Sequence, residues 1–247
     1  MAAASAVAGL FTARVLDADP DGDPPWLATE FVEGPSVRDA VLRNGPMPEP
    51  VLLDHARGLA EALGAIHAAG LVHRDLKPAN VLLSPTGPRV IDFGIARAVD
   101  ASRLTVTGQI IGTTDFMAPE QIEGVGESGA EVDVFALGST LVWAATGRGP
   151  FAADQTAATL YRILSMPPDL DGVPPRVADL ARACLAKDPA RRPSAVQLAV
   201  RLRGSDPTGS RPDVHPWAAD VAPQPAPTRG RRLVLGAGAL VAVAVAG

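Results

Sequence analysis

The stretch HRDLKPAN at residues 73–80, with the apolar run VLL behind it at 81–83, decides the fold of this 247-residue chain. It places an acid (Asp75), a cation (Lys77) and an amide (Asn80) on one irregular loop between a helix and a strand. The cation can neutralise a phosphate, and the acid can accept a proton from an attacking hydroxyl. The stretch therefore predicts a site for group-transfer chemistry.

A second conspicuous run, VIDFG, stands at residues 90–94, after turn residues at 84–87. Its first residues are typical of a strand, so the two apolar runs predict a β-hairpin. That hairpin would bring Asp92 beside Asn80. An Asp and an Asn side by side offer the hard oxygen ligands that Mg²⁺ prefers.

Together with these two runs, the triplet APE at residues 118–120 completes a set of motifs in a fixed order. On this set the chain resembles a serine/threonine protein kinase, most of all the bacterial receptor-type members with a membrane anchor after the kinase domain. Each triplet alone is typical of an ordinary turn, but the combination is specific. The resemblance implies an α+β, protein-kinase-like fold, with a mostly helical C-terminal lobe and only the last strands of the small lobe.

Residues 73–80 resemble the catalytic loop of the family, and the resemblance implies roles for its polar residues. Asp75 would orient the substrate hydroxyl and take its proton, and Lys77 would hold the γ-phosphate of ATP. Asn80 and Asp92 would bind Mg²⁺. A lysine two residues after the aspartate marks the Ser/Thr branch of the family, so the implied partners are proteins with Ser or Thr acceptors.

The nucleotide base would lie against the segment TEFV at residues 29–32, which resembles the gatekeeper and hinge of the family. Thr29 would be the gatekeeper, and the backbone groups of Glu30 and Val32 would bond the adenine edge. Leu82 would form part of the apolar floor under the ring, and Ser36 would contact the ribose.

The resemblance also implies regulation by phosphorylation of the segment before residue 118. Arg74 would pair with a phosphate on Thr105 or Thr107 and so order this segment. The alternative is that these are merely exposed loop threonines. Thr113 would lie against the catalytic aspartate and lysine and support the site.

Two further matches are structural. Glu120 and Arg192 resemble the buried ion pair that ties the activation segment to the lower lobe. Asp133 resembles the helix residue that anchors the backbone of the catalytic loop without taking part in the chemistry.

The lysine count bears on catalytic activity. Of the 22 Lys+Arg residues only Lys77 and Lys187 are lysines. The resemblance implies a Gly-rich loop and a lysine upstream of the hinge, yet the residues before Thr29 hold no lysine and no Gly-x-Gly-x-x-Gly. Two interpretations stay open: an N-terminally incomplete kinase that transfers phosphate poorly, or an inactive membrane-tethered remnant that acts as a binding or scaffold module.

Composition divides the chain into four parts: a small-lobe remnant at 1–32, a large lobe at 33–205, a Pro-rich linker at 206–232 and an apolar segment at 233–247. The last segment has no polar side chain and predicts a transmembrane helix, whose completeness the sequence leaves open. Arginines in front of it predict a single-pass protein of the cell membrane with the kinase region in the cytoplasm.

Hydrophobic periodicity predicts the elements of the body. Strands are expected near 12–16 and 26–32, and a helix is expected from Pro50 to Gly70. Further helices are expected over 133–146, 156–165, 176–186 and 195–203, and residues 1–10 are expected to be a fragment of another helix.

The net charge of −5 and the pI near 5.4 argue against a nucleic-acid partner. A single cysteine, Cys184, excludes an internal disulfide and a Cys-rich zinc site. A homodimer is compatible with the sequence.

Overall fold

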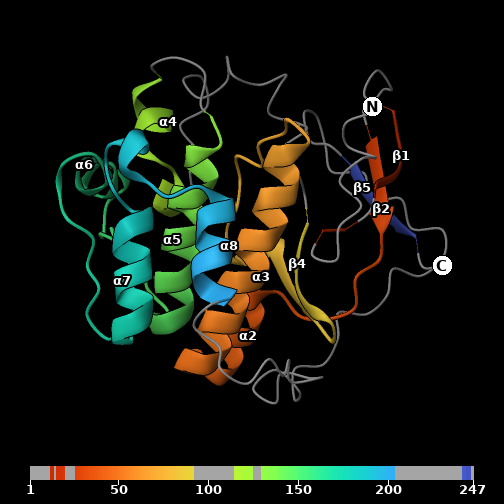
Figure 1. Ribbon diagram of the computed structural model, residues 1–247, viewed down its shortest axis with the longest axis horizontal. Coiled ribbons are helices and arrows are strands. Elements are labelled where there is room, and N and C mark those ends of the chain that lie inside the picture. Colours follow the sequence, from red (N-terminus) through yellow and green to blue (C-terminus); the bar gives the residue numbers. More distant parts are fainter. Residues whose placement is uncertain are drawn as a thin grey trace.

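The computed structural model describes residues 12–13, 15–19, 26–91, 114–124, 129–203 and 241–245. A helical body and a small sheet stand side by side in Figure 1. The strands are β1 (Val15–Asp19), β2 (Trp26–Glu30), β3 (Val81–Ser84), β4 (Gly87–Val90) and β5 (Val241–Val245). The helices are α2 (Val37–Asn44), α3 (Glu49–Ala68), α4 (Pro119–Glu123), α5 (Glu131–Thr146), α6 (Thr156–Ser165), α7 (Pro175–Cys184) and α8 (Ala195–Arg203), with 3-10 turns η1 (Pro78–Asn80), η3 (Thr114–Phe116) and η4 (Pro189–Arg191).

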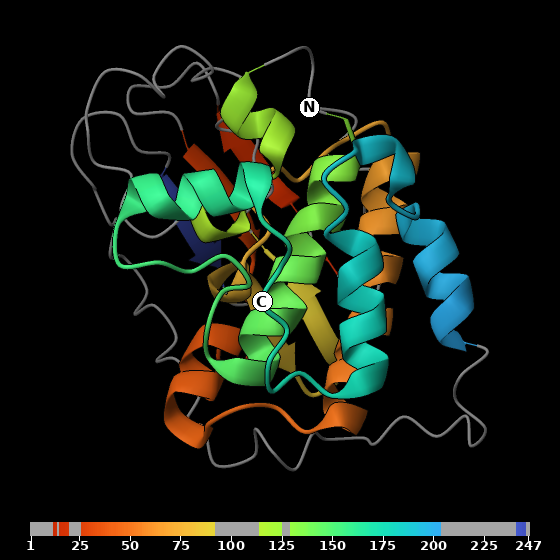
Figure 2. The ribbon, with the colours of Figure 1, turned by 90° about the vertical axis from the view of Figure 1, so that its left-hand side faces the viewer.

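Helix α5 is the centre of the helical body. Its residues from Val132 to Val142 are all buried, which is the pattern of a helix that packs on every side. It contacts α3 on one side and α7 on another, and α8 packs along α3. Figure 2 shows α7 beside α5, with α8 farther out along α3. The architecture is mostly helical with few strands, which confirms the α+β, kinase-like fold class.

The close approach of α5 to α7 depends on Gly138. A Cβ at this position would lie 2.8 Å from the Cβ of Cys184 and 3.0 Å from the Cγ of Leu185. Gly138→Ala is therefore expected to lower the free energy of unfolding by about 1–3 kcal/mol through overpacking, although alanine favours helix. Urea denaturation measures this loss.

Gly64 of α3 provides the matched control. A Cβ there would lie at an ordinary contact distance, 3.5 Å, from the Cγ2 of Val196. Gly64→Ala is expected to leave the free energy of unfolding unchanged or to raise it by up to about 1 kcal/mol, because alanine is the better helix former. Equal losses in the two variants would contradict the packing argument.

The strands form two separate sheets. β3 and β4 make an antiparallel hairpin with Val81 opposite Val90, and it packs against α3. β2 is the middle strand of the other sheet, antiparallel to β1 and parallel to β5.

Strand β5 differs from the expectation of a membrane helix over residues 233–247. The described part, Val241–Val245, is a strand that pairs with β2 from Trp26↔Val241 to Glu30↔Val245. Alternating valines suit a strand, and the edge of β2 offers backbone groups to pair with. Within the described ranges, we find no helix with the length and apolar character needed to cross a membrane.

Most other boundaries follow the sequence pattern closely. The helices α6 and α8 have the predicted bounds, and α3 spans Glu49–Ala68 within the expected region. The first strand spans Val15–Asp19 rather than residues 12–16, and it pairs with β2 from Val15↔Thr29 to Asp19↔Trp26. Thr12 instead forms an isolated bridge with Val90. Residues 1–10 lie outside the described ranges.

Candidate active site

The β3–β4 hairpin builds one wall of the candidate site. Asn80 ends the turn η1 immediately before β3, and its carbonyl oxygen accepts a hydrogen bond from the N–H of Ile91 at 3.0 Å. Ile91, the residue that precedes Asp92 in the sequence, is therefore held beside Asn80. Asp92 itself lies outside the described residues, and so do Thr105, Thr107 and Thr113.

The structure brings Asp75, Lys77 and Asn80 together in one polar cluster. The Oδ2 of Asp75 accepts hydrogen bonds from the Nζ of Lys77 at 2.7 Å and from the Nδ2 of Asn80 at 3.2 Å. The Nδ2 of Asn80 also donates to the carbonyl oxygen of Asp75 at 2.8 Å. The side chains of Asp75 and Lys77 are each 23% exposed, so solvent and substrate can reach them.

The chemistry of Asn80 suits a cation. Its Nδ2 group is engaged with Asp75, and among the described residues no donor reaches its Oδ1 atom. Asn80 is buried, so the amide is held in place. An amide oxygen in this setting is a hard ligand that fits Mg²⁺.

Asp133 of α5 holds the backbone of the catalytic loop through hydrogen bonds. Its buried carboxylate accepts hydrogen bonds from the N–H of His73 at 2.8 Å and from the N–H of Arg74 at 2.7 Å. A third bond joins its Oδ2 to the Nε2 of His67 at 2.8 Å. His67 was not predicted as a site residue, because a histidine in the last turn of a helix is usually taken for a surface residue.

His73 links the loop to the hairpin. Its Nδ1 accepts a hydrogen bond from the N–H of Asp75 at 3.2 Å, and its Nε2 lies 3.0 Å from the carbonyl oxygen of Ile91. Since a backbone N–H can only donate, Nδ1 is the acceptor and Nε2 carries the proton. The buried imidazole thus connects Asp75 to Ile91, the residue that follows β4 and precedes Asp92.

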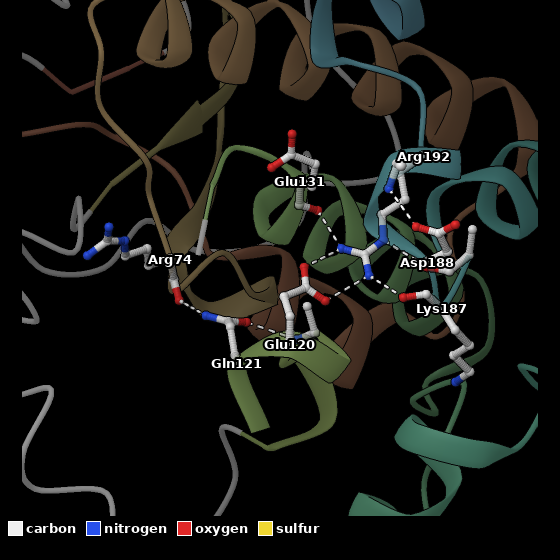
Figure 3. A network of polar contacts seen from close by, with 10 residues as sticks. Arg74, Glu120, Gln121, Glu131, Lys187, Asp188 and Arg192 are labelled. Atoms are coloured by element: carbon white, nitrogen blue, oxygen red, sulfur yellow. Dashed lines mark hydrogen bonds and ion pairs between the residues drawn. The ribbon is translucent and has the colours of Figure 1, made fainter. Parts of the chain in front are cut away.

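Glu120 and Arg192 form a bidentate ion pair, drawn in Figure 3. The Nη1 of Arg192 lies 2.6 Å from Oε1 of Glu120, and its Nη2 lies 2.9 Å from Oε2. The remaining guanidinium N–H groups donate to the carbonyl oxygens of Ala186, Glu131 and Lys187. The side chain of Arg192 is fully buried. All its donors are satisfied, so the pair fixes α4 on the helical body.

Lys187, the second lysine of the chain, makes structural contacts at the end of α6. Its Nζ lies 3.8 Å from the centre of the Phe151 ring and donates to the carbonyl oxygens of Arg162 and Ile163 at the end of α6. Burial, and then the nearby charge of Arg192, lower the pKa of Lys187 to about 8.

The lowered pKa of Lys187 predicts a pH dependence of stability. Between about pH 8 and its ordinary pKa of 10.5, the folded chain has lost a proton that the unfolded chain keeps. Rising pH therefore favours the folded state, by on the order of 1 kcal/mol after solvent screening. Lys187→Met removes this pH-dependent contribution. The stability advantage of the unchanged chain over the variant, as a difference in the free energy of unfolding, should therefore increase above pH 8.

Denaturant titrations at several pH values measure that difference. Burial raises the pKa of Cys184 from 9.0 to about 12, which favours unfolding above pH 9, but this term cancels between the two proteins. Parallel pH curves for the unchanged chain and Lys187→Met would contradict the prediction.

The segment after the predicted hinge runs beside β3. Ser36 forms an antiparallel bridge with Leu82, and the N–H of Leu83 donates to the carbonyl oxygen of Pro35 at 2.8 Å. Leu82 is half-buried, as are Thr29, Glu30 and Val32. The structure thus places the segment at Pro35 and Ser36, shortly after the predicted hinge, beside the predicted floor residue Leu82.

Ser36, the predicted ribose contact, has a local partner for its hydroxyl in the structure. Its Oγ accepts a hydrogen bond from the N–H of Asp39 at 3.0 Å and donates to the Oδ2 of Asp39 at 2.8 Å. Ser36 is buried and is the N-cap of α2. Serine is a strongly preferred N-cap residue, so this local role satisfies its hydroxyl.

Comparisons with known proteins show the family of the chain. A family model described as the protein kinase domain matches residues 13–201. A probable serine/threonine-protein kinase PkwA of Thermomonospora curvata is 48% identical over 84% of this chain and 28% of its own length. The serine/threonine-protein kinase AfsK of Streptomyces coelicolor is 46% identical over 84% of this chain and 27% of its own length.

More distant proteins extend the comparison. PknL of Mycobacterium tuberculosis, a serine/threonine-protein kinase, is 37% identical over 72% of this chain and 46% of its own length. The crystal structure of Rad53 1–466 in complex with AMP-PNP has a TM-score of 0.65 at 24% identity, and the match covers 79% of this chain and 51% of that one. The chain spans less than half the length of each of these curated relatives. It belongs to the protein kinase family, among the bacterial serine/threonine protein kinases.

Proposed function

We propose that this chain carries the catalytic lobe of a serine/threonine protein kinase, which transfers the γ-phosphate of ATP to Ser and Thr hydroxyls of proteins. The observation that carries the proposal is the cluster of Asp75, Lys77 and Asn80, held from behind by Asp133. The names of the relatives support the Ser/Thr class.

In the proposed mechanism Asp75 accepts the hydrogen bond of the substrate hydroxyl and takes its proton as the oxygen attacks. Its ion pair with Lys77 keeps the carboxylate oriented, and Lys77 neutralises charge on the transferred phosphate. Asn80 and Asp92 would hold Mg²⁺, which offsets the negative charge of the phosphates when bound.

The nucleotide would bind between the predicted hinge and the strand β3. Backbone groups of Glu30 and Val32 would bond the adenine edge below Thr29, over the apolar surface of Leu82. No lysine remains for the α- and β-phosphates, because Lys77 lies in the catalytic loop and Lys187 caps α6. We therefore propose that the chain as given transfers phosphate slowly, since charge stabilisation supplies most of phosphoryl-transfer catalysis.

Regulation is proposed to act through Arg74, which lies next to the catalytic Asp75. A phosphate on Thr105 or Thr107 would add about two negative charges and pair with this arginine, and Thr113 would support the site.

A second candidate function rests on the lysine count alone. A kinase remnant with two lysines would serve as a binding or scaffold module, without catalysis.

Phosphate transfer distinguishes the two functions. The purified chain is incubated for hours with radiolabelled Mg-ATP and a Ser/Thr-containing protein, beside Asp75→Asn. The kinase proposal expects slow incorporation on Ser or Thr that is lost in Asp75→Asn. Equal background in both proteins would refute it and favour the scaffold.

Attachment to the cell membrane through residues 233–247, with the kinase region in the cytoplasm, stays part of the proposal. The pairing of Val241–Val245 with β2 competes with it, because one segment cannot occupy both places. Flotation of the chain with lipid vesicles, against a chain ending at residue 232, tests it; equal flotation would speak against an anchor.

A further inference from the structure

The peptide group between Arg74 and Asp75 is held by a residue that the kinase motifs do not include. Its carbonyl oxygen accepts a hydrogen bond from the Nε2 of Gln121 at 3.4 Å. Its N–H, which belongs to Asp75, donates to the Nδ1 of His73 at 3.2 Å. Figure 3 shows the side chain of Gln121 directed from α4 toward the oxygen of Arg74.

The orientation of the Gln121 amide follows from its other partner. The N–H of Ala118 lies 2.9 Å from the side-chain oxygen of Gln121. Because a backbone N–H can only donate, the atom that faces it must be Oε1, and the atom that faces Arg74 must be the donor Nε2. A single side chain therefore bridges the beginning of α4 and the catalytic loop.

Arg74 needs such a restraint. It has a φ of 65°, the only positive value among the non-glycine residues that the structure describes. This conformation is costly for a residue with a Cβ and persists only where its surroundings enforce it. Asp133 holds the N–H on one side of Arg74 at 2.7 Å, and Gln121 holds the carbonyl on the other.

We infer that Gln121 is a positioning residue, which fixes the plane of the Arg74–Asp75 peptide and thereby the direction of the Asp75 carboxylate. Its neighbour Glu120 is anchored on Arg192, so the position of α4 determines the position of the Arg74–Asp75 peptide through the amide of Gln121. The catalytic meaning of this link rests on the proposed function, whereas the restraint on the peptide does not.

Gln121→Glu removes the hydrogen bond to Arg74 while keeping the one from Ala118. The glutamate keeps an acceptor for the N–H of Ala118 but turns an oxygen, rather than a donor, toward the carbonyl of Arg74. Gln121→Met removes both contacts without adding charge. Gln197→Glu is the matched control, since Gln197 accepts from the N–H of Ser194 at 2.8 Å at the beginning of α8, far from the catalytic loop in sequence.

Hydrogen–deuterium exchange of the full chain, followed by mass spectrometry, reads the peptide that contains residues 74–77. Exchange at the Asp75 N–H is expected to be about 3- to 10-fold faster in Gln121→Glu and in Gln121→Met, and unchanged in Gln197→Glu. Unchanged exchange in either Gln121 variant would overturn the inference, whatever the activity of the chain.

The rate of phosphate transfer provides a second test of the inference. Gln121→Glu should lower kcat for transfer and leave the KM for ATP unchanged, because Gln121 lies on the Asp75 side of the site and not at the hinge. A raised KM with unchanged kcat would count against positioning of Asp75. Faster exchange in the variants, together with no transfer by the unchanged chain, would leave the inference standing and refute only the proposed function.

Discussion

Replacing Arg192 by methionine is expected to lower the free energy of unfolding by about 3–5 kcal/mol. The substitution leaves the carboxylate of Glu120, whose side chain is 17% exposed, without its partner. It also removes the donors to the carbonyl oxygens of Ala186, Glu131 and Lys187. Urea denaturation of the two proteins at neutral pH measures the loss.

The control is an ion pair of the same chemistry on the surface. Arg203 lies 2.9 Å from Glu61, with 67% of the arginine side chain exposed. Arg203→Met is expected to cost less than about 1 kcal/mol, because solvent screens the pair. The double variant Glu120→Met with Arg192→Met should recover part of the loss. If Arg192→Met cost no more than Arg203→Met, the pair would not be the anchor of α4.

Asp133→Asn is the second substitution with a large expected effect, a loss of about 2–4 kcal/mol. The buried carboxylate accepts hydrogen bonds at both oxygens, from the N–H of His73 and the N–H of Arg74. An asparagine keeps one acceptor oxygen but turns an NH₂ group toward the other N–H. A buried donor is then left unsatisfied, and the positive φ of Arg74 loses a restraint.

Denaturation and amide exchange at residues 73 and 74 measure this effect, and Asp169→Asn is its control. Asp169 accepts from the N–H of Asp171 at 3.0 Å, a bond that lowers the pKa of Asp169, but its side chain is 51% exposed. The control should lose less than about 1 kcal/mol. Unchanged exchange at residues 73 and 74 in Asp133→Asn would show that α5 does not hold the loop.

The catalytic loop was the part of the site that the sequence could predict. Asp75, Lys77 and Asn80 lie within six positions of one another, so local geometry is enough to bring them together. Glu120 and Arg192 lie far apart in the sequence, and only the kinase resemblance linked them. The structure places them in contact.

Contacts that depend on the packing of the whole fold could not be predicted from the sequence. His67 and Gln121 are polar residues on helices with no distinctive spacing, and their partners depend on how α3 and α4 pack around the loop. Ser36 was assigned by motif position, while its own helix competes for its hydroxyl. Val241–Val245, the described part of the predicted membrane segment, shows the limit of prediction from hydropathy, because alternating valines also suit a strand.

The most direct test is the rate of phosphate transfer by the full chain at saturating Mg-ATP, compared with Asp75→Asn. With its catalytic loop assembled but no lysine for the α- and β-phosphates, the chain should transfer phosphate at least about 100-fold below the roughly 1–100 s⁻¹ of protein kinases. The small remaining transfer should disappear in Asp75→Asn. Transfer at ordinary kinase rates that is lost in Asp75→Asn would contradict the predicted need for that lysine.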